Sequence, residues 1–533
     1  MKVMKFGGTS VADRAAIERL IALVRAERQA EAQKEGGDAR GPVVVVSALS
    51  GVTDRLLGVA ALAGSGDVEG AHASLQDLRK RHITVSEVIT DDALRRPVVD
   101  ALNREFDELE RIVHALAVLQ EVSPRWLDTL AATGEVLSSQ IVAAAISANK
   151  LPGAWVDARK AVVTNGEHTA AAPLFEETTA ALMTHADPPL AAGRIPVLGG
   201  FVGATTGGVT TTLGRGGSDF SAAIVGACLG ADEIQIWTDV DGMLTADPRI
   251  VKSPQVVPHL SFAEASELAY FGAKVLHPAT IQPAVARNIP VRILNSQRAQ
   301  ARGTLITAER PRTERPLTAV ASKKGVTVVD ITSTRMLMAH GFLRRLFEVF
   351  ERHKTPVDVV TTSEVSVSVT IDDARRLPAI IEGLSGFADV ERQDNMAIVC
   401  VVGDGLHEDP TLASQVLASV GDVPLRMVSQ AASRRNITFV ISEGELPTAL
   451  GRLHDRFFGE GAAVVRLKPD TTSKPDTTSK PDTTSKPDTT SKPDATSKPD
   501  TTSKPDATSK PDTTSKPDTT SKPDTTSKLG AAS

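Results

Sequence analysis

The chain has 533 residues and a formal net charge of −6 at pH 7. A mildly acidic chain gives no electrostatic reason to expect a nucleic acid or an anionic membrane as its partner, and the two cysteines, Cys228 and Cys400, lack the spacing of metal ligands. Because the N-terminus has no long apolar signal core, and no uninterrupted apolar stretch is expected to span a bilayer, we expect a cytoplasmic protein.

Short β-branched runs alternate with longer helical patterns over residues 1–302. Strands are predicted at 43–46, 195–198 and 233–237. Apolar residues at 17, 20, 21 and 24 share one face of a predicted helix, and two small-residue-rich helices are predicted at 137–148 and 218–229. Strands that alternate with helices favour an α/β fold in which helices sandwich a mostly parallel sheet.

The pattern changes after residue 302, and the polar stretch 310–316 is interpreted as a linker. Residues 317–467 then read as two α+β units of βαββαβ design in tandem, which is typical of a paired small regulatory domain. Strands are expected at 325–331, 357–360, 365–371, 396–402, 437–441 and near 464, and helices at 342–350, from 373, at 411–420 and at 446–458.

Residues 468–533 are a low-complexity tail. The hexapeptide KPDTTS repeats ten times from Lys468, with alanine replacing a threonine at Ala495 and Ala507. Because the repeats have no apolar side chains to bury and each contains a proline, we expect a disordered and partly extended segment. A spacer or a multivalent ligand is the functional alternative.

Two glycine- and hydroxyl-rich segments follow the first two predicted strands. In KFGGTS, residues 5–10, glycines let the backbone approach phosphate oxygens and a lysine could neutralise charge on a moving phosphoryl group. In SALSGVTD, residues 47–54, hydroxyls could bind a substrate carboxylate. Each segment could instead be a tight turn that caps the next helix.

Two further segments carry charge near strand ends. In TTTLGRGGSD, residues 210–219, an arginine lies among three glycines, which favours two-pronged recognition of a carboxylate or phosphate. WTDVDG, residues 237–242, is followed by DPR at 247–249 and lacks the spacing of a calcium loop, so we interpret it as a loop around a nucleotide. No P-loop, protein-kinase motif set or G-x-G-x-x-G dinucleotide fingerprint occurs.

These four segments, in this order, resemble the amino acid kinase superfamily and, within it, the aspartate kinases. KFGGTSV at 5–11 is similar to that family's opening signature, and FGAKVLHP at 271–278 resembles a segment of aspartate kinases alone. The resemblance extends to about residue 467. It implies an amino acid kinase catalytic domain at 1–302 that phosphorylates the side-chain carboxylate of L-aspartate with ATP, the first step toward lysine, threonine and methionine.

The resemblance also assigns roles to residues. Lys5 would stabilise the transferring phosphoryl group, Glu135 would hold the α-amino group of aspartate and Arg215 its α-carboxylate, while Leu244 stands where some relatives have a tyrosine near the adenine. The catalytic residues are then Lys5 and Asp219, and the substrate contacts are Ser47, Thr53, Glu135, Arg215 and Ser218. The predicted nucleotide contacts are Gly7, Gly8, Ser10, Thr238, Asp239, Arg249 and Lys274.

The expected chemistry fits this inventory. A carboxylate is already an anion at pH 7 and needs no general base, so catalysis would consist of positioning and charge stabilisation. We expect ATP and Mg²⁺ as cofactors. No dedicated protein cage for the metal is expected, because Mg²⁺ usually binds the phosphates and waters.

The C-terminal pair resembles the ACT regulatory domains of the lysine-sensitive aspartate kinases. The implied effector contacts are Met336, Ala339, Phe342, Leu343, Val357, Asp358, Thr362 and Glu364, with Asp358 binding the effector directly. Ala339 and Pro356 replace serines of some lysine-sensitive relatives, so lysine is the expected effector and threonine stays open. The resemblance implies a homodimer or homotetramer formed through these domains; a purely dimer-forming module is the alternative.

Two other functions are compatible with parts of the chain. Another carboxylate or carbamate kinase of the superfamily would share the phosphate-binding segments, but Glu135 and the 271–278 segment argue against it. A non-catalytic amino-acid sensor would keep the ACT pair, but Lys5, Arg215 and Lys274 argue for activity.

Overall fold

The computed structural model describes residues 1–33, 40–214, 216–272, 276–310, 317–333, 340–404, 406, 409–430 and 434–459. These residues belong to one compact unit, Met1–Lys468, and the second unit, Pro469–Ser533, lies outside the described residues. The disorder of the repeat tail therefore stays a prediction, as do the domain boundaries at residues 302, 317 and 467.

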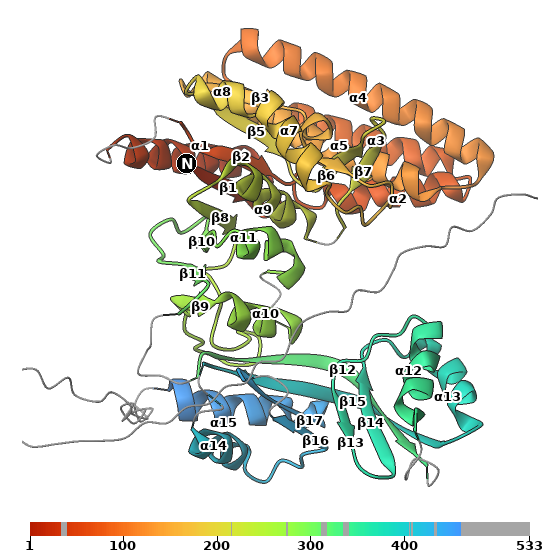
Figure 1. The fold of residues 1–533 in the computed structure, drawn as a ribbon. Coiled ribbons are helices and arrows are strands. Elements are labelled where there is room, and N and C mark those ends of the chain that lie inside the picture. The colour runs from red at the N-terminus through yellow and green to blue at the C-terminus, as the bar shows by residue number, and fades with distance from the viewer. Residues whose placement is uncertain are drawn as a thin grey trace, which may run out of the picture. The chain divides into compact units, whose positions relative to one another are not determined.

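An eight-stranded sheet organises the first part of the chain (Figure 1), in the order β3-β5-β2-β1-β8-β10-β11-β9. Neighbouring strands from β3 to β10 pair in parallel, and β11 pairs antiparallel with β10. The expectation of a mostly parallel sheet is thus confirmed. The strands are β1 (Lys2–Phe6), β2 (Val43–Val46), β3 (Gly153–Val156), β5 (Ile195–Gly199), β8 (Glu233–Thr238), β9 (His259–Ser261), β10 (Val291–Asn295) and β11 (Thr304–Thr307).

Helices cover both faces of this sheet, and β2 shows why. Val43 and Val45 enter one hydrophobic core, whereas Val44 and Val46 enter the other. A strand without a solvent face is formed by a continuous apolar run rather than by an alternating one. The longer helices are α1 (Arg14–Ala32), α2 (Val52–Gly64), α3 (Val68–Val85), α4 (Asp92–Leu119), α5 (Pro124–Ala148), α7 (Phe175–His185), α9 (Gly217–Leu229) and α10 (Phe262–Tyr270), and the shorter ones are η1 (Gly8–Ser10), α6 (Ala158–Ala161), α8 (Asp187–Ala191) and α11 (Gln282–Ala286).

Helix α5 bears on the expectation that no uninterrupted apolar stretch spans a bilayer. It is long and apolar enough to cross a membrane by length and composition, but most of its apolar stretch is buried inside the fold, where it packs against α2, α4 and β5. Its apolar character is therefore that of a core helix. The cytoplasmic location stays a prediction.

A small three-stranded sheet stands beside the main one and carries loops toward the same edge. It consists of β4 (Val163–Thr164), β6 (Val202–Thr205) and β7 (Thr210–Thr212). The Oγ1 atoms of Thr164 and Thr211 lie 2.6 Å apart in its interior. Strand β7 leads directly into the glycine-rich segment that precedes α9.

The second part of the chain, from β12 to α15, contains one antiparallel sheet of six strands, in the order β13-β14-β12-β15-β17-β16. Helices α12 and α13 enclose one core with this sheet, and α14 and α15 enclose another. The elements are β12 (Ala319–Thr332), α12 (Phe342–Arg352), β13 (Val360–Thr362), β14 (Ser366–Ile371), α13 (Leu377–Ser385), β15 (Asp389–Val402), α14 (Pro410–Val420), β16 (Met427–Gln430), β17 (Asn436–Ser442) and α15 (Leu446–Phe458).

Two ACT-type units are present, but they are not separate bodies in tandem. Strands β12 and β15 each have 14 residues and run through both units, so that the two sheets are continuous. Their pairing shifts register between Lys323 and Val328, around Gly325, whose φ is 71°. This bulge marks where one unit passes into the other.

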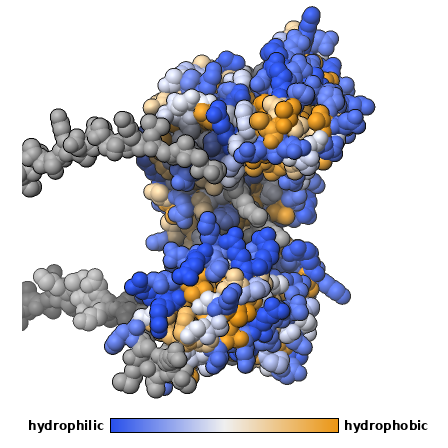
Figure 2. Space-filling model, turned by 90° about the vertical axis from the view of Figure 1, so that its right-hand side faces the viewer, coloured by the Kyte–Doolittle hydropathy of each residue, from blue (hydrophilic) through white to orange (hydrophobic). Residues whose placement is uncertain are grey.

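Two strand predictions need correction. Strand β13 begins at Val360 rather than 357, and β16 was not expected, because it has only four residues, MVSQ, of which two are polar. The strand expected near 464 and the linker residues 311–316 lie outside the described residues. The face shown in Figure 2 is largely hydrophilic, with hydrophobic side chains gathered in patches.

Candidate active site

Two adjoining cavities open where the parallel strands end, the place at which α/β sheets bind ligands. The larger has a volume of about 600 Å³ and the smaller about 440 Å³. Six residues line both, namely Lys5, Ser47, Thr53, Asp54, Glu135 and Asp219. The separate segments that the sequence pointed to are therefore brought together around one shared wall.

The smaller cavity is lined by the glycine turn after β1 and the loop after β2. The backbones approach closely, since a Cβ on Gly8 would lie 3.2 Å from the carbonyl oxygen of Ala48. Backbone of this kind can reach phosphate oxygens without side-chain interference. Its lining also includes Gly7, Thr9, Thr238 and Asp239.

Lys5 lies between the two cavities, at the end of β1. Its side chain is largely buried, and Nζ is 2.6 Å from Oδ1 of Asp219 on α9. Oδ1 is buried and has this charge pairing but no hydrogen-bond donor among the described residues. A cation held this way is available to a phosphoryl group that reaches the boundary between the cavities.

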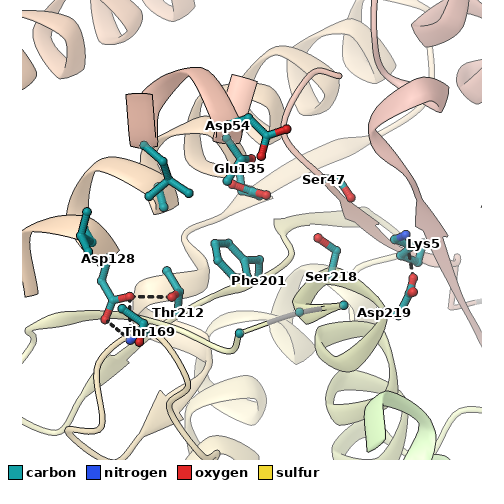
Figure 3. A pocket seen from close by; sticks show the side chains of 17 residues that line it. Lys5, Ser47, Asp54, Asp128, Glu135, Thr169, Phe201, Thr212, Ser218 and Asp219 are labelled. Atoms are coloured by element: carbon teal, nitrogen blue, oxygen red, sulfur yellow. Dashed lines mark hydrogen bonds and ion pairs between the residues drawn. The ribbon is translucent and has the colours of Figure 1, made fainter. Parts of the chain in front are cut away.

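Glu135 projects into the shared wall from α5 (Figure 3). Burial raises the pKa of its carboxyl to about 8, although the backbone N–H groups of Ala48 and of Glu135 itself partly oppose this. Its Oε2 atom is buried and has no hydrogen-bond partner among the described residues. Because a buried carboxylate needs a hydrogen-bonding or cationic partner, the site is suited to an ammonium group.

The glycine-rich loop after β7 forms another wall of the larger cavity. Gly214 and Gly216 adopt φ values of 76° and 70°, which favour glycine, and Gly217 begins α9. Ser218 lines the cavity from the first turn of that helix. Arg215, the predicted carboxylate-binding residue, lies outside the described residues.

Several lining residues were not identified from the sequence. Asp54, Asp128, Thr169, Phe201 and Thr212 all face the larger cavity. Asp128 could have been found, because it precedes Glu135 by seven residues on the same helix and so shares its face. Thr169 and Phe201 reach the cavity only through the tertiary fold.

Some predicted nucleotide contacts are placed elsewhere. Ser10 is buried beside the cavity, where its hydroxyl donates to Ser296 Oγ at 2.8 Å, and it lines neither cavity. Arg249 is exposed and pairs with Asp247 at 2.6 Å. Leu244 forms an isolated bridge with Val256, and Lys274 lies outside the described residues. The roles of these four residues stay predictions.

Among the predicted effector residues, Asp358 has the most distinctive surroundings. Its carboxylate is 2.8 Å from Nζ of Lys323 and accepts a hydrogen bond of 2.9 Å from the hydroxyl of Tyr270. Phe342 is buried, Val357 is half-buried and Leu343, Thr362 and Glu364 are exposed, whereas Met336 and Ala339 lie outside the described residues.

The segment after β8 that contains residues 245–251, here called the arm after β8, packs against the second part of the chain, which runs from β12 to α15. Ala246 and Val251 belong to the same hydrophobic core as α14 and α15. Thr245 Oγ1 lies 3.0 Å from Nε2 of His454 on α15, and both residues are buried. The segment after β8 that was predicted to contact the nucleotide is therefore also part of the core formed by α14 and α15.

Comparisons with known proteins agree with this geometry. Residues 1–295 match the amino acid kinase family, and residues 399–457 match an ACT domain. Aspartokinase 1 of Arabidopsis thaliana, a chloroplast protein, is 37% identical over 86% of this chain and 80% of its own length. The lysine-sensitive aspartokinase 3 of Escherichia coli is 33% identical over 86% of this chain and 99% of its own length.

Solved structures give the same result. Escherichia coli aspartokinase III in complex with aspartate and ADP has a TM-score of 0.73 and 32% identity, covering 86% of this chain and 100% of that one. The same enzyme in complex with lysine and aspartate has a TM-score of 0.71 and 31% identity, covering 86% and 99%. The chain described above therefore belongs to the amino acid kinase family and, within it, is an aspartokinase.

Proposed function

We propose that the smaller cavity receives ATP and the larger one L-aspartate, with phosphoryl transfer at their boundary beside Lys5. The observation that carries this proposal is the shared wall, in which a buried cation lies together with a buried carboxyl whose Oε2 atom has no hydrogen-bond partner among the described residues. The glycine backbone would hold phosphates, and the deeper carboxyl would hold the amino group of the acceptor. The relative that binds ADP and aspartate supports this division.

Aspartate would be held at both ends of its backbone. Glu135 would pair with its ammonium group and Arg215 with its α-carboxylate, while Ser47, Thr53 and Ser218 would complete the pocket. This arrangement leaves the side-chain carboxylate to face the γ-phosphate. Since that carboxylate is already an anion at neutral pH, the remaining requirement is to offset its repulsion from the nucleotide, and Lys5 supplies a positive charge there.

Mg²⁺ fits the smaller cavity. The ion typically takes one or two carboxylates together with phosphate oxygens and waters. Asp219 and Asp239 line this cavity and offer such oxygens. When bound, the ion would neutralise charge on the phosphates, and these two residues would hold it.

Regulation by an amino acid, with lysine as the effector, is proposed for the ACT part. The support is the pair of fused ACT-type units and the resemblance to a lysine-sensitive aspartokinase. A third observation is that the carboxylate of Asp358 forms an ion pair with the side-chain ammonium group of Lys323. Assembly into a homodimer or homotetramer through these units is part of the same proposal. Light scattering of the purified protein would measure its mass in solution.

The Lys5→Met substitution tests the proposed site. Methionine keeps much of the side-chain volume but removes the charge, so we expect kcat to fall about 100-fold or more while KM for aspartate changes little. ADP release measured with aspartate, with glutamate and without acceptor gives these constants. The matched control is Lys2→Met on the same strand, since Lys2 pairs with Glu27 at 2.7 Å and lines neither cavity. A kcat within a few-fold of wild type would contradict the role of Lys5.

A further inference from the structure

Asp128 has a buried carboxylate that is fully engaged by the protein itself. Its exposed fraction is 1%, and it lies on α5, two helical turns before Glu135. Oδ1 accepts hydrogen bonds from Thr212 Oγ1 at 2.5 Å and from the backbone N–H of Thr169 at 3.0 Å. Oδ2 lies 2.6 Å from Nδ1 of His168 and 3.1 Å from the same N–H of Thr169.

These contacts join three segments that are distant in sequence (Figure 3). Asp128 belongs to α5, His168 and Thr169 to the loop after β4, and Thr212 to the end of β7. The backbone N–H of Ala171 also donates to the carbonyl oxygen of Thr212 at 2.9 Å, so the loop and the strand are tied to each other as well. The side chain of Asp128 holds His168, Thr169 and Thr212 together.

The loop held in this way is strained. Thr169 has φ of 70°, a conformation that a β-branched residue rarely adopts, and Phe201 in the same cavity has φ of 65°. Such residues are energetically unfavourable and persist only where the surroundings fix them, which happens most often at functional sites. For Thr169, the surrounding contact is the N–H group shared between both oxygens of Asp128.

The contacts of Asp128 with His168, Thr169 and Thr212, here called the clamp, act on the glycine-rich loop of the active site. Thr212 is two residues before Gly214, and a Cβ on Gly214 would lie 3.3 Å from the carbonyl oxygen of Thr169. The strained loop therefore packs directly on the start of the segment 214–217, which contains Arg215 in the sequence. The other end of the clamp is the helix that carries Glu135.

We propose that Asp128 is a positioning residue for substrate recognition: it fixes the distance between Glu135 and the glycines Gly214, Gly216 and Gly217, and thereby the length of amino acid that fits between them. Asp128 has no free acceptor to offer a substrate and acts through the groups it holds. The inference rests on the proposed roles of Glu135 and Arg215. Its consequence is that loosening the clamp weakens aspartate binding and relaxes the exclusion of glutamate, without affecting the nucleotide.

Asp128→Asn is the direct test. The amide keeps one acceptor oxygen and the size of the side chain but loses the second acceptor. We expect KM for aspartate to rise about tenfold, KM for ATP to stay within twofold, and the ratio of kcat/KM for aspartate over glutamate to fall. The control is Asp157→Asn, because Asp157 also accepts hydrogen bonds from a backbone N–H and an arginine in this part of the chain but lines neither cavity.

Thr212 provides a second test that does not alter a charge. Thr212→Val removes the hydroxyl donor and should raise KM for aspartate, whereas Thr212→Ser should restore it. If either Asp128→Asn or Thr212→Val only lowers Tm with both KM values unchanged, or raises both KM values equally, Asp128 is a purely structural residue and the proposal is overturned.

Glu135→Gln, measured in parallel, separates this inference from the function it rests on. If Glu135→Gln leaves KM for aspartate unchanged while Asp128→Asn raises it, the role of Glu135 is wrong and the clamp still positions the loop. If Glu135→Gln raises KM and Asp128→Asn does not, the positioning role of Asp128 fails alone.

Discussion

Glu135 shows how a single side chain can couple substrate binding to pH. In the free enzyme its pKa of about 8, raised by burial, keeps the carboxyl largely protonated at neutral pH. The ammonium group of bound aspartate would favour the charged form and lower that pKa. Binding and proton release are then linked, so affinity for aspartate should increase as the pH rises toward 8.

This linkage predicts that KM for aspartate falls between pH 6 and pH 8, by up to about tenfold per pH unit in the limit of strong coupling. Glu135→Gln should have a higher KM that depends little on pH in this range. Initial rates at several aspartate concentrations and saturating ATP would measure both profiles. A wild-type KM that is flat across the range would show that Glu135 is not the titrating partner.

At the residue scale, the sequence predicted the parts of the site that follow strands. Lys5 lies near the end of β1, and Ser47 and Asp239 lie just beyond β2 and β8. The carboxyl ends of these three strands meet at one edge, so the convergence of the three residues follows from the parallel pairing. Phe201 and Thr169 could not be predicted, because their conformations at positive φ depend on contacts with segments far along the chain.

At the scale of elements, helix α3 contains a buried histidine that the proposed mechanism does not use. His82 has an exposed fraction of 0%, its Nδ1 lies 2.7 Å from the carbonyl oxygen of Leu78, and its ring packs edge-on against Phe106 of α4. Nε2 has no hydrogen-bond partner among the described residues. Burial, with a smaller contribution from Arg81, lowers the pKa of His82 to about 4.

The lowered pKa predicts acid sensitivity of the α3–α4 packing. The unfolded chain takes up a proton at His82 near pH 6.5, whereas the folded chain does so only near pH 4. The free energy of unfolding is therefore unaffected by His82 above pH 6.5 and decreases as the pH falls from 6.5 toward 4. The loss should reach about 2 kcal/mol at pH 5. Denaturant unfolding at pH 7 and pH 5 would measure it.

His82→Leu should reduce this pH dependence, because the titrating group is removed. The matched control is His72→Leu on the same helix, where the histidine is exposed and the pH dependence should be retained. An equal difference between pH 7 and pH 5 in wild type and His82→Leu would assign the acid sensitivity to other groups.

The elements themselves were predicted best where the hydrophobic pattern is strong. Strand β2 and helix α15 were predicted with the bounds that the structure shows, since continuous burial and a 3.6-residue period leave little ambiguity. The fusion of the two ACT-type units was not predicted. A strand that continues through a bulge looks, in sequence, like two short strands of separate units.

At the scale of the whole molecule, regulatory and catalytic parts share contacts that could transmit a signal. The arm after β8 enters the core of one ACT unit through Ala246 and Val251. In the other unit, Asp358 bonds to Tyr270, the last residue of α10, which directly precedes the segment containing Lys274. A change at either ACT unit therefore has a physical route to residues predicted to contact the nucleotide.

The contacts of Asp358 sharpen the prediction for regulation. Lys323 supplies an ammonium group to Asp358 at 2.8 Å and to Asp372 at 2.8 Å. A free lysine effector would present the same group to the same carboxylate and would compete with Lys323. The effector could then release Tyr270 as well, since the hydroxyl of Tyr270 donates to the other oxygen of Asp358.

We expect lysine to inhibit the enzyme at subsaturating aspartate, and Asp358→Asn to shift the half-inhibiting concentration upward about tenfold or more. The coupling that this requires is about 1–3 kcal/mol between active and inhibited states, a typical allosteric magnitude.

Tyr270→Phe tests the route separately: it keeps the carboxylate for lysine but removes its bond to α10, so lysine should still bind while maximal inhibition decreases. Lysine titrations of the initial rate, each relative to the uninhibited rate of the same variant, together with calorimetric lysine binding, distinguish the two effects. Inhibition of wild type by threonine alone would change the effector but keep the module, whereas unchanged lysine inhibition of Asp358→Asn would mean that the effector binds elsewhere.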